Sequence, residues 1–178
     1  MMRTLESIDQ TFRETVRQYP AKDALICKEK SFTFAELDAS VEKLAKGLYH
    51  QGLRQQAKAI VFMPHMSEWL TIWLALQRLG CTAVPVSHFY GHDYVHYIAK
   101  DSTAEIAFCT QSNLDRVVAG APGTGLKNIV VADLAELTDN EKNQVSEQFA
   151  IKALGSLLQD SAQELPEIKI GARDLAEI

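Results

Sequence analysis

The sequence predicts an α/β domain with a mainly parallel sheet and alternating helices, preceded by an N-terminal helix and a β-hairpin. Four short apolar runs, at residues 59–63, 81–86, 105–109 and 128–132, have the composition of buried strands. Helical patterns lie between these runs, and this alternation is typical of a parallel sheet with right-handed crossovers. Apolar residues make up 47% and charged residues 23% of the chain, which is an ordinary globular composition.

The first elements expected are a helix and a hairpin. The helix is indicated by apolar residues at helical spacing, namely Ile8, Phe12, Val16 and Tyr19. Pro20 should end it. The runs 24–27 and 31–34 flank the charged residues 28–30, which predicts two antiparallel strands joined by a tight turn.

A capping box at Thr33 and Glu36 predicts the start of the next helix. Its apolar stripe consists of Leu37, Val41, Leu44 and Leu48. Gly52 stands where a helix C-terminal cap belongs. Later, Ser67 is expected to cap the helix 68–79, which Gly80 closes. The other helices of the alternation are expected around residues 92–100 and near 113–119.

A second capping box, at Thr138 and Glu141, predicts a longer and more polar helix. This helix should carry the apolar residues Val145, Phe149, Leu154, Leu157 and Leu158. After Pro166 the sequence has the character of a linker. We therefore predict one subdomain over residues 1–166 and a linker over 167–178.

Charge and apolar patterning exclude several classes of protein. The net charge of −5 argues against a nucleic-acid surface. The first residues contain no apolar signal segment, and the longest apolar stretch, 69–80, is too short for a membrane span. The three cysteines, Cys27, Cys81 and Cys109, form no CxxC pair and lie in apolar runs. We therefore expect buried reduced thiols in a cytoplasmic protein.

The glycine-rich stretch 120–127 superficially resembles a phosphate loop. Such a loop has the form G-x-x-x-x-G-K-[ST] and opens a helix after a strand. Here Leu126 precedes Lys127, Asn128 replaces the hydroxyl residue, and the stretch leaves a helix to enter a strand. We interpret it as a connecting turn.

Three histidines, His88, His92 and His96, cluster in one stretch. His92 and His96 share a helical face and could hold a metal ion, but a third aligned ligand is missing. The favoured interpretation is an exposed polar helix start, with Tyr94 and Ile98 packing inward. His65 is interpreted as a loop residue. No catalytic, cofactor-binding or metal-ligating residue is predicted anywhere in the chain.

The order of segments resembles the AMP-forming acyl-CoA ligase family, closest to its long-chain fatty acyl-CoA branch. The segments that carry the resemblance are SFTFAEL at 31–37, the block 58–86, YIAKDSTAEIAFC at 97–109 and LKNIVVAD at 126–133. The segment ARDLAEI at 172–178 is similar to the family's lead-in to its phosphate loop. Two departures are His65, where the family usually has Asn, and residues 87–95, which lack the usual Pro.

The resemblance implies the N-terminal subdomain of the acyl-adenylate ligase fold. It further implies that ATP, Mg²⁺ and CoA are bound by the remainder of the ligase, which would be the partner of this part, and that residues 1–178 alone are inactive. A non-catalytic interaction module and a small-ligand-binding domain are the alternatives. We also expect self-association, either through an uncovered apolar face with Trp69, Ile72, Trp73 and Leu76 or through an unpaired strand edge at Leu175–Ile178.

Overall fold

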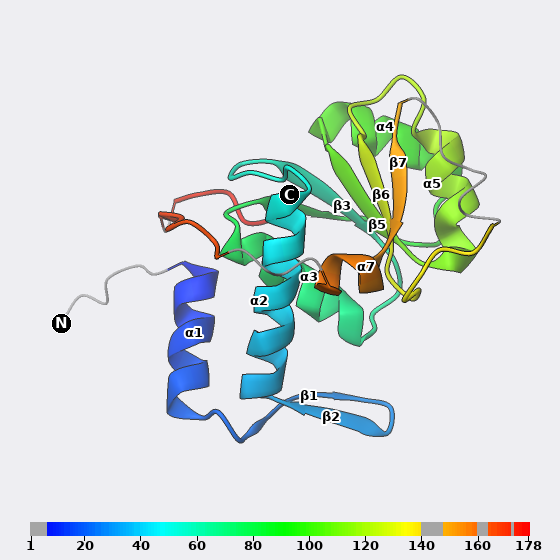
Figure 1. Cartoon of the computed structure of the whole chain (residues 1–178). Helices are drawn as coiled ribbons and strands as arrows, with labels where there is room; N and C mark the ends of the chain where they lie inside the picture. The colour runs from blue at the N-terminus through cyan, green and yellow to red at the C-terminus, as the bar shows by residue number, and fades with distance from the viewer. Residues whose placement is uncertain (1–6, 140–147, 160–163, 172) are drawn as a thin grey trace.

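The chain folds into a five-stranded parallel sheet with helices on both faces and a smaller helix–hairpin unit beside it (Figure 1). The computed structural model describes residues 7–139, 148–159, 164–171 and 173–178. The strand order is β4-β3-β5-β6-β7. The strands are β3 (Lys58–Phe62), β4 (Thr82–Pro85), β5 (Ile106–Cys109), β6 (Asn128–Val131) and β7 (Ala150–Ala153).

The helices divide into two layers. The first consists of α2 (Phe34–His50), α3 (Ser67–Arg78) and α7 (Leu154–Gln159), and the second of α4 (His92–Ser102) and α5 (Leu114–Gly120). A 3-10 turn, η1 (Gln111–Asn113), leads into α5. These elements confirm the predicted α/β class with a mainly parallel sheet.

Strand alternation sends side chains to two cores. In β3, Ala59 and Val61 belong to the core under the first layer, whereas Ile60 and Phe62 belong to the core under the second. This follows from the two-residue period of a strand. We call these the first core and the second core. A sheet covered on both faces explains why successive residues inside β3, β5 and β6 are apolar on both sides of the strand.

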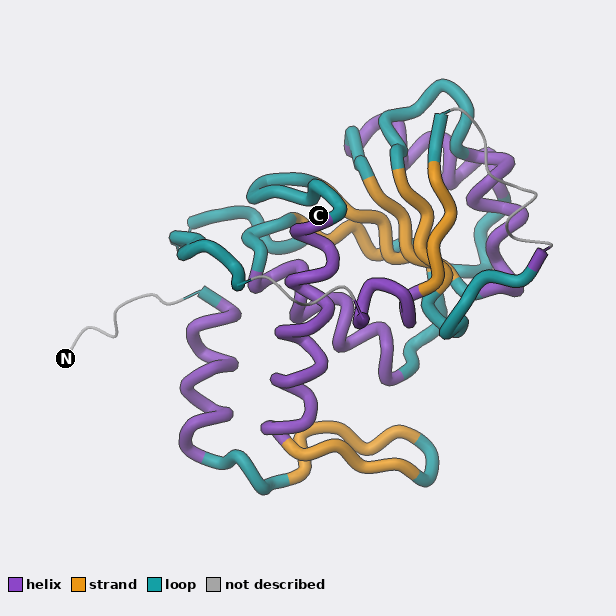
Figure 2. The backbone as a smooth tube through the Cα atoms, in the orientation of Figure 1, coloured by secondary structure: helices purple, strands orange, loops and turns teal. Residues whose placement is uncertain are grey.

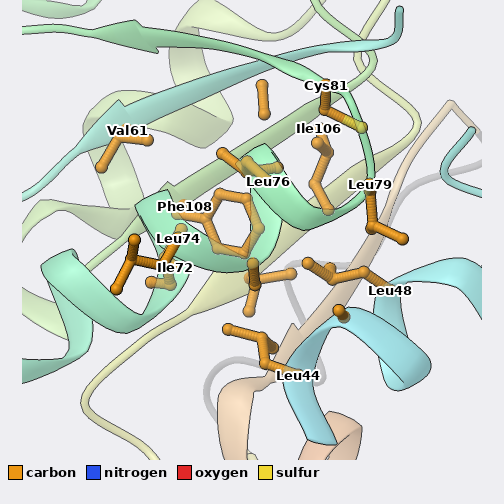
Figure 3. Packing of buried hydrophobic residues seen from close by; sticks show 14 of the residues in the cluster. Leu44, Leu48, Val61, Ile72, Leu74, Leu76, Leu79, Cys81, Ile106 and Phe108 are labelled. Carbon is orange, nitrogen blue, oxygen red and sulfur yellow. The ribbon is translucent and has the colours of Figure 1, made fainter. Parts of the chain in front are cut away.

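Phe108 lies at the centre of the first core. Its ring is fully buried, and Figure 3 shows it between the sheet, α3 and the α2 residues Leu44 and Leu48. Ile72 and Leu76 of α3 are also fully buried. The expectation that the apolar face of α3 is uncovered was therefore wrong for these two residues. Only Trp69 and Trp73 of that set remain half-exposed.

The N-terminal unit consists of α1 (Ile8–Gln18) and the antiparallel hairpin β1 (Asp23–Cys27) and β2 (Lys30–Thr33), which Figure 2 shows apart from the main sheet. The capping box of Thr33 and Glu36 is present at the start of α2. Ser7 and Gln10 form a similar box at α1 that the sequence reading missed. Gly52 and Gly80 have φ values of +92° and +64°, as expected of residues that end helices.

Several predicted details were wrong. Ala150–Ala153 is the strand β7, so no single helix can run through Phe149 to Leu158. The capping box at Thr138 and Glu141 lies partly outside the described residues. Met66, not Ser67, is the N-cap of α3, since Met66 has the extended backbone and the Ser67 hydroxyl bonds Glu68.

Residues near the end of the chain lie along the edge of β4. Ala83 donates a backbone hydrogen bond to Ala176 (2.9 Å) and accepts one from Ile178 (3.1 Å), in a parallel bridge between Ala83 and Glu177. The Thr82 hydroxyl donates to the Leu175 carbonyl at 3.0 Å. Residues 175–178 are thus paired with the edge of β4 through one isolated bridge, so the expectation of an unpaired strand there was wrong. Among the described residues, no helix has the length and apolar character that a bilayer crossing requires.

Candidate functional site

The carboxyl ends of β3 and β5 form the point where ligands bind in sheets of this kind. β3 and β5 are neighbours, but the chain leaves β3 through α3 in the first layer and reaches β5 through α4 in the second. Open α/β sheets bind ligands where consecutive connections diverge in this way. The loops after β3, β4 and β5 are therefore the place to look for chemistry.

Polar groups in these loops mostly bond to one another. The Thr110 and Ser112 hydroxyls, just after β5, lie 3.0 Å apart. The backbone N–H of Gln111 donates to the Asp133 carboxylate, which follows β6, at 2.8 Å. These bonds hold the loops in register. Among the contacts of the described residues, no hydroxyl group is hydrogen-bonded to a histidine that could act as its base.

Arg116 of α5 fixes the loop that connects β4 to α4. Its guanidinium donates to the carbonyls of His88 (2.8 Å) and Tyr90 (3.1 Å) and to the Asn113 side chain. It also lies 5.4 Å from the centre of the Phe62 ring. Because these three hydrogen bonds go to protein oxygens on both sides, Arg116 holds the β4–α4 loop against the start of α5. No motif in the sequence marked this residue.

The three clustered histidines have separate surroundings. His92 lies 3.2 Å from the neighbouring Asp93 carboxylate, and His96 Nδ1 lies 3.1 Å from the Gly120 carbonyl. The His88 ring packs on Phe89 with 4.1 Å between centroids. Within the described residues, no group of three or more His, Cys, Asp or Glu side chains could hold a metal ion. The absence of a functional metal site there stays a prediction.

The interior side of α4 differs from the expectation. Val95 and Ala99 are its buried apolar residues, and Ile98 is partly buried. Tyr94 is 51% exposed, so its predicted inward packing was wrong. Small residues face inward because α4 packs closely against α5. A Cβ atom added at Gly120 of α5 would lie only 3.0 Å from the side chain of Val95 on α4.

The loop 120–127 is a connector, as expected. It leaves α5 at Gly120 and enters β6, so it lies at the amino end of the sheet and not at the carboxyl end. Lys127 pairs with Glu105 at 2.6 Å. A phosphate loop would need the opposite edge and a free lysine.

A half-exposed aromatic column follows β3. His65 lies 5.4 Å from Trp69 between ring centroids, and Trp69 stacks on Trp73 at 6.4 Å. The Trp73 indole N–H donates to the Glu177 carboxylate at 2.8 Å. The column therefore joins the carboxyl end of β3 to residues 175–178. Its partly exposed rings form an apolar surface at this end of the sheet.

Arg78 is the most buried charge among the described residues. Its guanidinium bonds Asp9 of α1 (2.9 Å) and Asp38 and Glu42 of α2 (2.6 and 3.1 Å). Burial alone would lower the pKa of Arg78, but the charges and hydrogen bonds of Asp9 and Asp38 outweigh burial and raise it. The cluster joins three helices, which is a structural role.

Two of the three thiols are buried as expected. Burial, with a contribution from Glu105, raises the pKa of Cys81 to about 12. Burial also raises the pKa of Cys109, with a contribution from Asp133. Neither thiol can act as a nucleophile near neutral pH. Cys27 is only half-buried, so the expectation was too strong for that residue.

The contacts of the described residues build and brace the fold, and the absence of catalytic residues among them stays a prediction. Comparison with known proteins explains what kind of scaffold this is. The family model described as "AMP-binding enzyme" matches residues 12–177. The chain belongs to the AMP-binding enzyme family. The resemblance found in the sequence is confirmed at this level.

Curated relatives of this AMP-binding chain are much longer than it is. The Bacillus subtilis protein YngI, described as an acyl-CoA synthetase, is 24% identical over 80% of the chain, which spans 25% of YngI. Tyrocidine synthase 1 of Brevibacillus parabrevis is 27% identical over 76% of the chain, which spans 12% of that protein. The chain therefore corresponds to a quarter or less of these two relatives.

Solved structures confirm the fold of the AMP-binding chain. A long-chain-fatty-acid-CoA ligase (FadD1) from Archaeoglobus fulgidus matches 99% of the chain with a TM-score of 0.83 at 18% identity, over 34% of its own length. The N-terminal subdomain of NpsA from Klebsiella oxytoca matches 98% with a TM-score of 0.73 at 19% identity, over 37% of its own. The predicted N-terminal subdomain fold is confirmed.

Proposed function

We propose that this chain forms the N-terminal part of an ATP-dependent acid–CoA ligase. The observation that carries the proposal is the family match over residues 12–177 of a chain that spans 25% of YngI. In the proposed reaction a carboxylate attacks the α-phosphate of ATP and pyrophosphate leaves. The CoA thiol then attacks the acyl adenylate, forming a thioester and releasing AMP. A Mg²⁺ ion would stabilise the developing phosphate charge.

In this proposal the described residues position other parts of the ligase. ATP, Mg²⁺ and CoA would be held by the remainder of the enzyme, to which residues 175–178 lead along the edge of β4. The aromatic column of His65, Trp69 and Trp73 would lie beside that path. The buried thiols of Cys81 and Cys109 fit a reducing compartment such as the cytoplasm.

A long-chain fatty acid is the proposed substrate class. The sequence resemblance to that branch and the likeness to FadD1 favour it. Solved structures similar to the chain also include an anthranilate CoA ligase and a benzoate CoA ligase, so aromatic acids, together with amino acids, are the comparison substrates. CoA is proposed as the thiol acceptor, and a carrier-protein thiol is the competing acceptor.

Acid-dependent exchange of labelled pyrophosphate into ATP tests the proposal. The longest natural gene product that contains this chain should catalyse exchange with long-chain fatty acids and then form acyl-CoA. Residues 1–178 alone should remain at background. Exchange only with amino acids or aromatic acids would refute the substrate class. No exchange with any acid would refute the ligase and favour a non-catalytic interaction module or a small-ligand binder.

A further inference from the structure

The outer side of α4 carries a row of exposed aromatic rings. Tyr90, Tyr94 and Tyr97 are 43%, 51% and 63% exposed. The ring centroids of Tyr90 and Tyr94 lie 4.4 Å apart, and those of Tyr94 and Tyr97 lie 6.4 Å apart. We call these three residues the tyrosine row. Its rings contact one another, while the buried residues of α4, such as Val95 and Ala99, face the second core.

The row is large enough to matter for association. At about 150–250 Å² for each aromatic side chain, the three tyrosines expose roughly 240–390 Å². This reaches the range of the largest apolar patch on a typical monomer, about 300–600 Å², and such patches often bind partners. A stable interface needs roughly 800 Å² from each side, so the row with its polar rim fits a weak, reversible one.

The charged residues beside the tyrosine row could pair with the same residues of a second copy. Asp93, Tyr97 and Lys100 are spaced four and three residues apart, which places them on one helical face. Asp93 and Lys100 are both exposed, one at the start of α4 and one near its end. Two such helices in antiparallel orientation would bring the Asp93 carboxylate of each against the Lys100 ammonium of the other. Tyr97 would then lie near the two-fold axis.

We propose that two copies of this chain associate through antiparallel α4 helices. Tyr94 and Tyr97 form the centre of the interface, and Asp93 of each copy pairs with Lys100 of the second copy. The pattern favours a second copy over an unrelated partner because the same face supplies both the acidic and the basic group. This face differs from the α3 face expected from the sequence, whose Ile72 and Leu76 are buried.

Sedimentation velocity of the 178-residue chain over about 5–500 µM tests the proposal. The average mass should rise from one chain to two over this range. Tyr97→Ser should weaken association at least about tenfold. Tyr19→Ser is the matched control, because Tyr19 is 47% exposed and lies far from α4 in the fold, as the C-cap residue of α1. A monomer at every concentration, or a dimer that Tyr97→Ser leaves intact, would overturn the proposal.

Charge reversal tests the antiparallel arrangement itself. Asp93→Lys and Lys100→Asp should each weaken the dimer about tenfold, because each places like charges opposite one another twice. The double variant Asp93→Lys with Lys100→Asp should recover association to within about threefold of the original. Circular dichroism should verify that each variant is folded. A double variant as weak as the single ones would refute the pairing.

Discussion

The two helices that flank β4 in the chain, α3 and α4, differ in how many neighbours they have. α3 lies between the sheet and α2, and its buried residues include polar Gln77 and charged Arg78. α4 covers the other face, has no helix outside it among the described elements, and buries only Val95, Ala99 and Ser102. A helix between two partners needs apolar residues nearly all round, whereas a surface helix needs one stripe.

The difference between α3 and α4 shows that a dense apolar run in the sequence indicates burial in the core more than it indicates an exposed surface for association. The run 69–76 is the most apolar helical stretch. Four of its residues are nevertheless buried in the first core, namely Ile72, Leu74, Ala75 and Leu76. The more polar α4 presents tyrosines to solvent. The following experiments can break or sharpen this comparison, beginning with the largest expected effect.

Thiol reactivity tests whether the two helix layers exclude solvent equally well from the two cores. Cys81 lies in the first core and Cys109 in the second. We expect the half-buried Cys27 to react with a disulfide reagent near pH 8 at least about a thousandfold faster than either, since the buried thiols need opening of the fold. In strong denaturant all three should react alike. Fast modification of Cys109 would mean that the second core opens by itself.

Truncating one large side chain on α3 and one on α4 compares how much each helix face contributes to the free energy of unfolding. Leu76→Ala removes a fully buried side chain at the centre of the first core and should destabilise the chain by about 4 kcal/mol. Tyr97→Ala on α4 is the matched change and should stay within about 0.5 kcal/mol. Urea unfolding of dilute protein measures both. Similar effects at the two positions would contradict the comparison.

The basic residues near the two helix ends give a second contrast. Arg78→Ala leaves Asp9, Asp38 and Glu42 without their shared cation and should lower stability by about 3 kcal/mol. Lys100→Ala on α4 removes an exposed charge and should change stability by about 0.5 kcal/mol or less. Chemical unfolding at low protein concentration measures this pair. An Arg78 variant as stable as the Lys100 variant would show that the ion cluster contributes little.

Helix caps give the smallest expected effect. α3 and α4 begin without a side-chain cap, whereas α2 begins with Thr33 and Glu36. The Thr33 backbone N–H and hydroxyl lower the pKa of Glu36 from its ordinary 4.5. A lowered pKa adds stability above the ordinary value and loses it as the pH falls through the folded value. Wild type should therefore lose slightly more stability than Glu36→Gln on acidification.

Urea midpoints at about pH 6 and pH 3.5 measure this difference. Glu29→Gln, in the exposed hairpin turn, serves as the charge-matched control and should follow wild type. An identical pH response of wild type and Glu36→Gln would mean that the capping box does not contribute to the stability of α2.

Most of the fold followed from local signals in the sequence. The strands β3 to β6 coincide with the four predicted apolar runs, apart from a polar first residue in β3, β4 and β6, and the Thr33–Glu36 box fixes the start of α2. β7 was missed because Lys152 interrupts a four-residue strand. The spacing of five positions between Phe149 and Leu154 does not fit the apolar stripe of a helix, and this was the signal that could have revealed β7.

The site region was less predictable. Arg116 and Arg78 act through partners far away in the sequence, so no spacing marks them. The exposure of Tyr94 depends on how closely Gly120 lets α5 approach α4, which is a tertiary property. Family motifs gave the fold because they include the turns and caps that build it. That this part of the chain holds no reacting group stays a prediction.

The hydrogen bond between Thr82 and Leu175 has a consequence for folding during synthesis on the ribosome. These residues are 93 positions apart, so β4 leaves the ribosome long before the segment that lines its edge. At about 5–20 residues per second, this delay is roughly 5–20 s. Through that interval the nascent sheet exposes the Ala83 backbone to any passing strand. Pro85, which has no N–H to offer, shortens the part of β4 that a wrong strand could pair with.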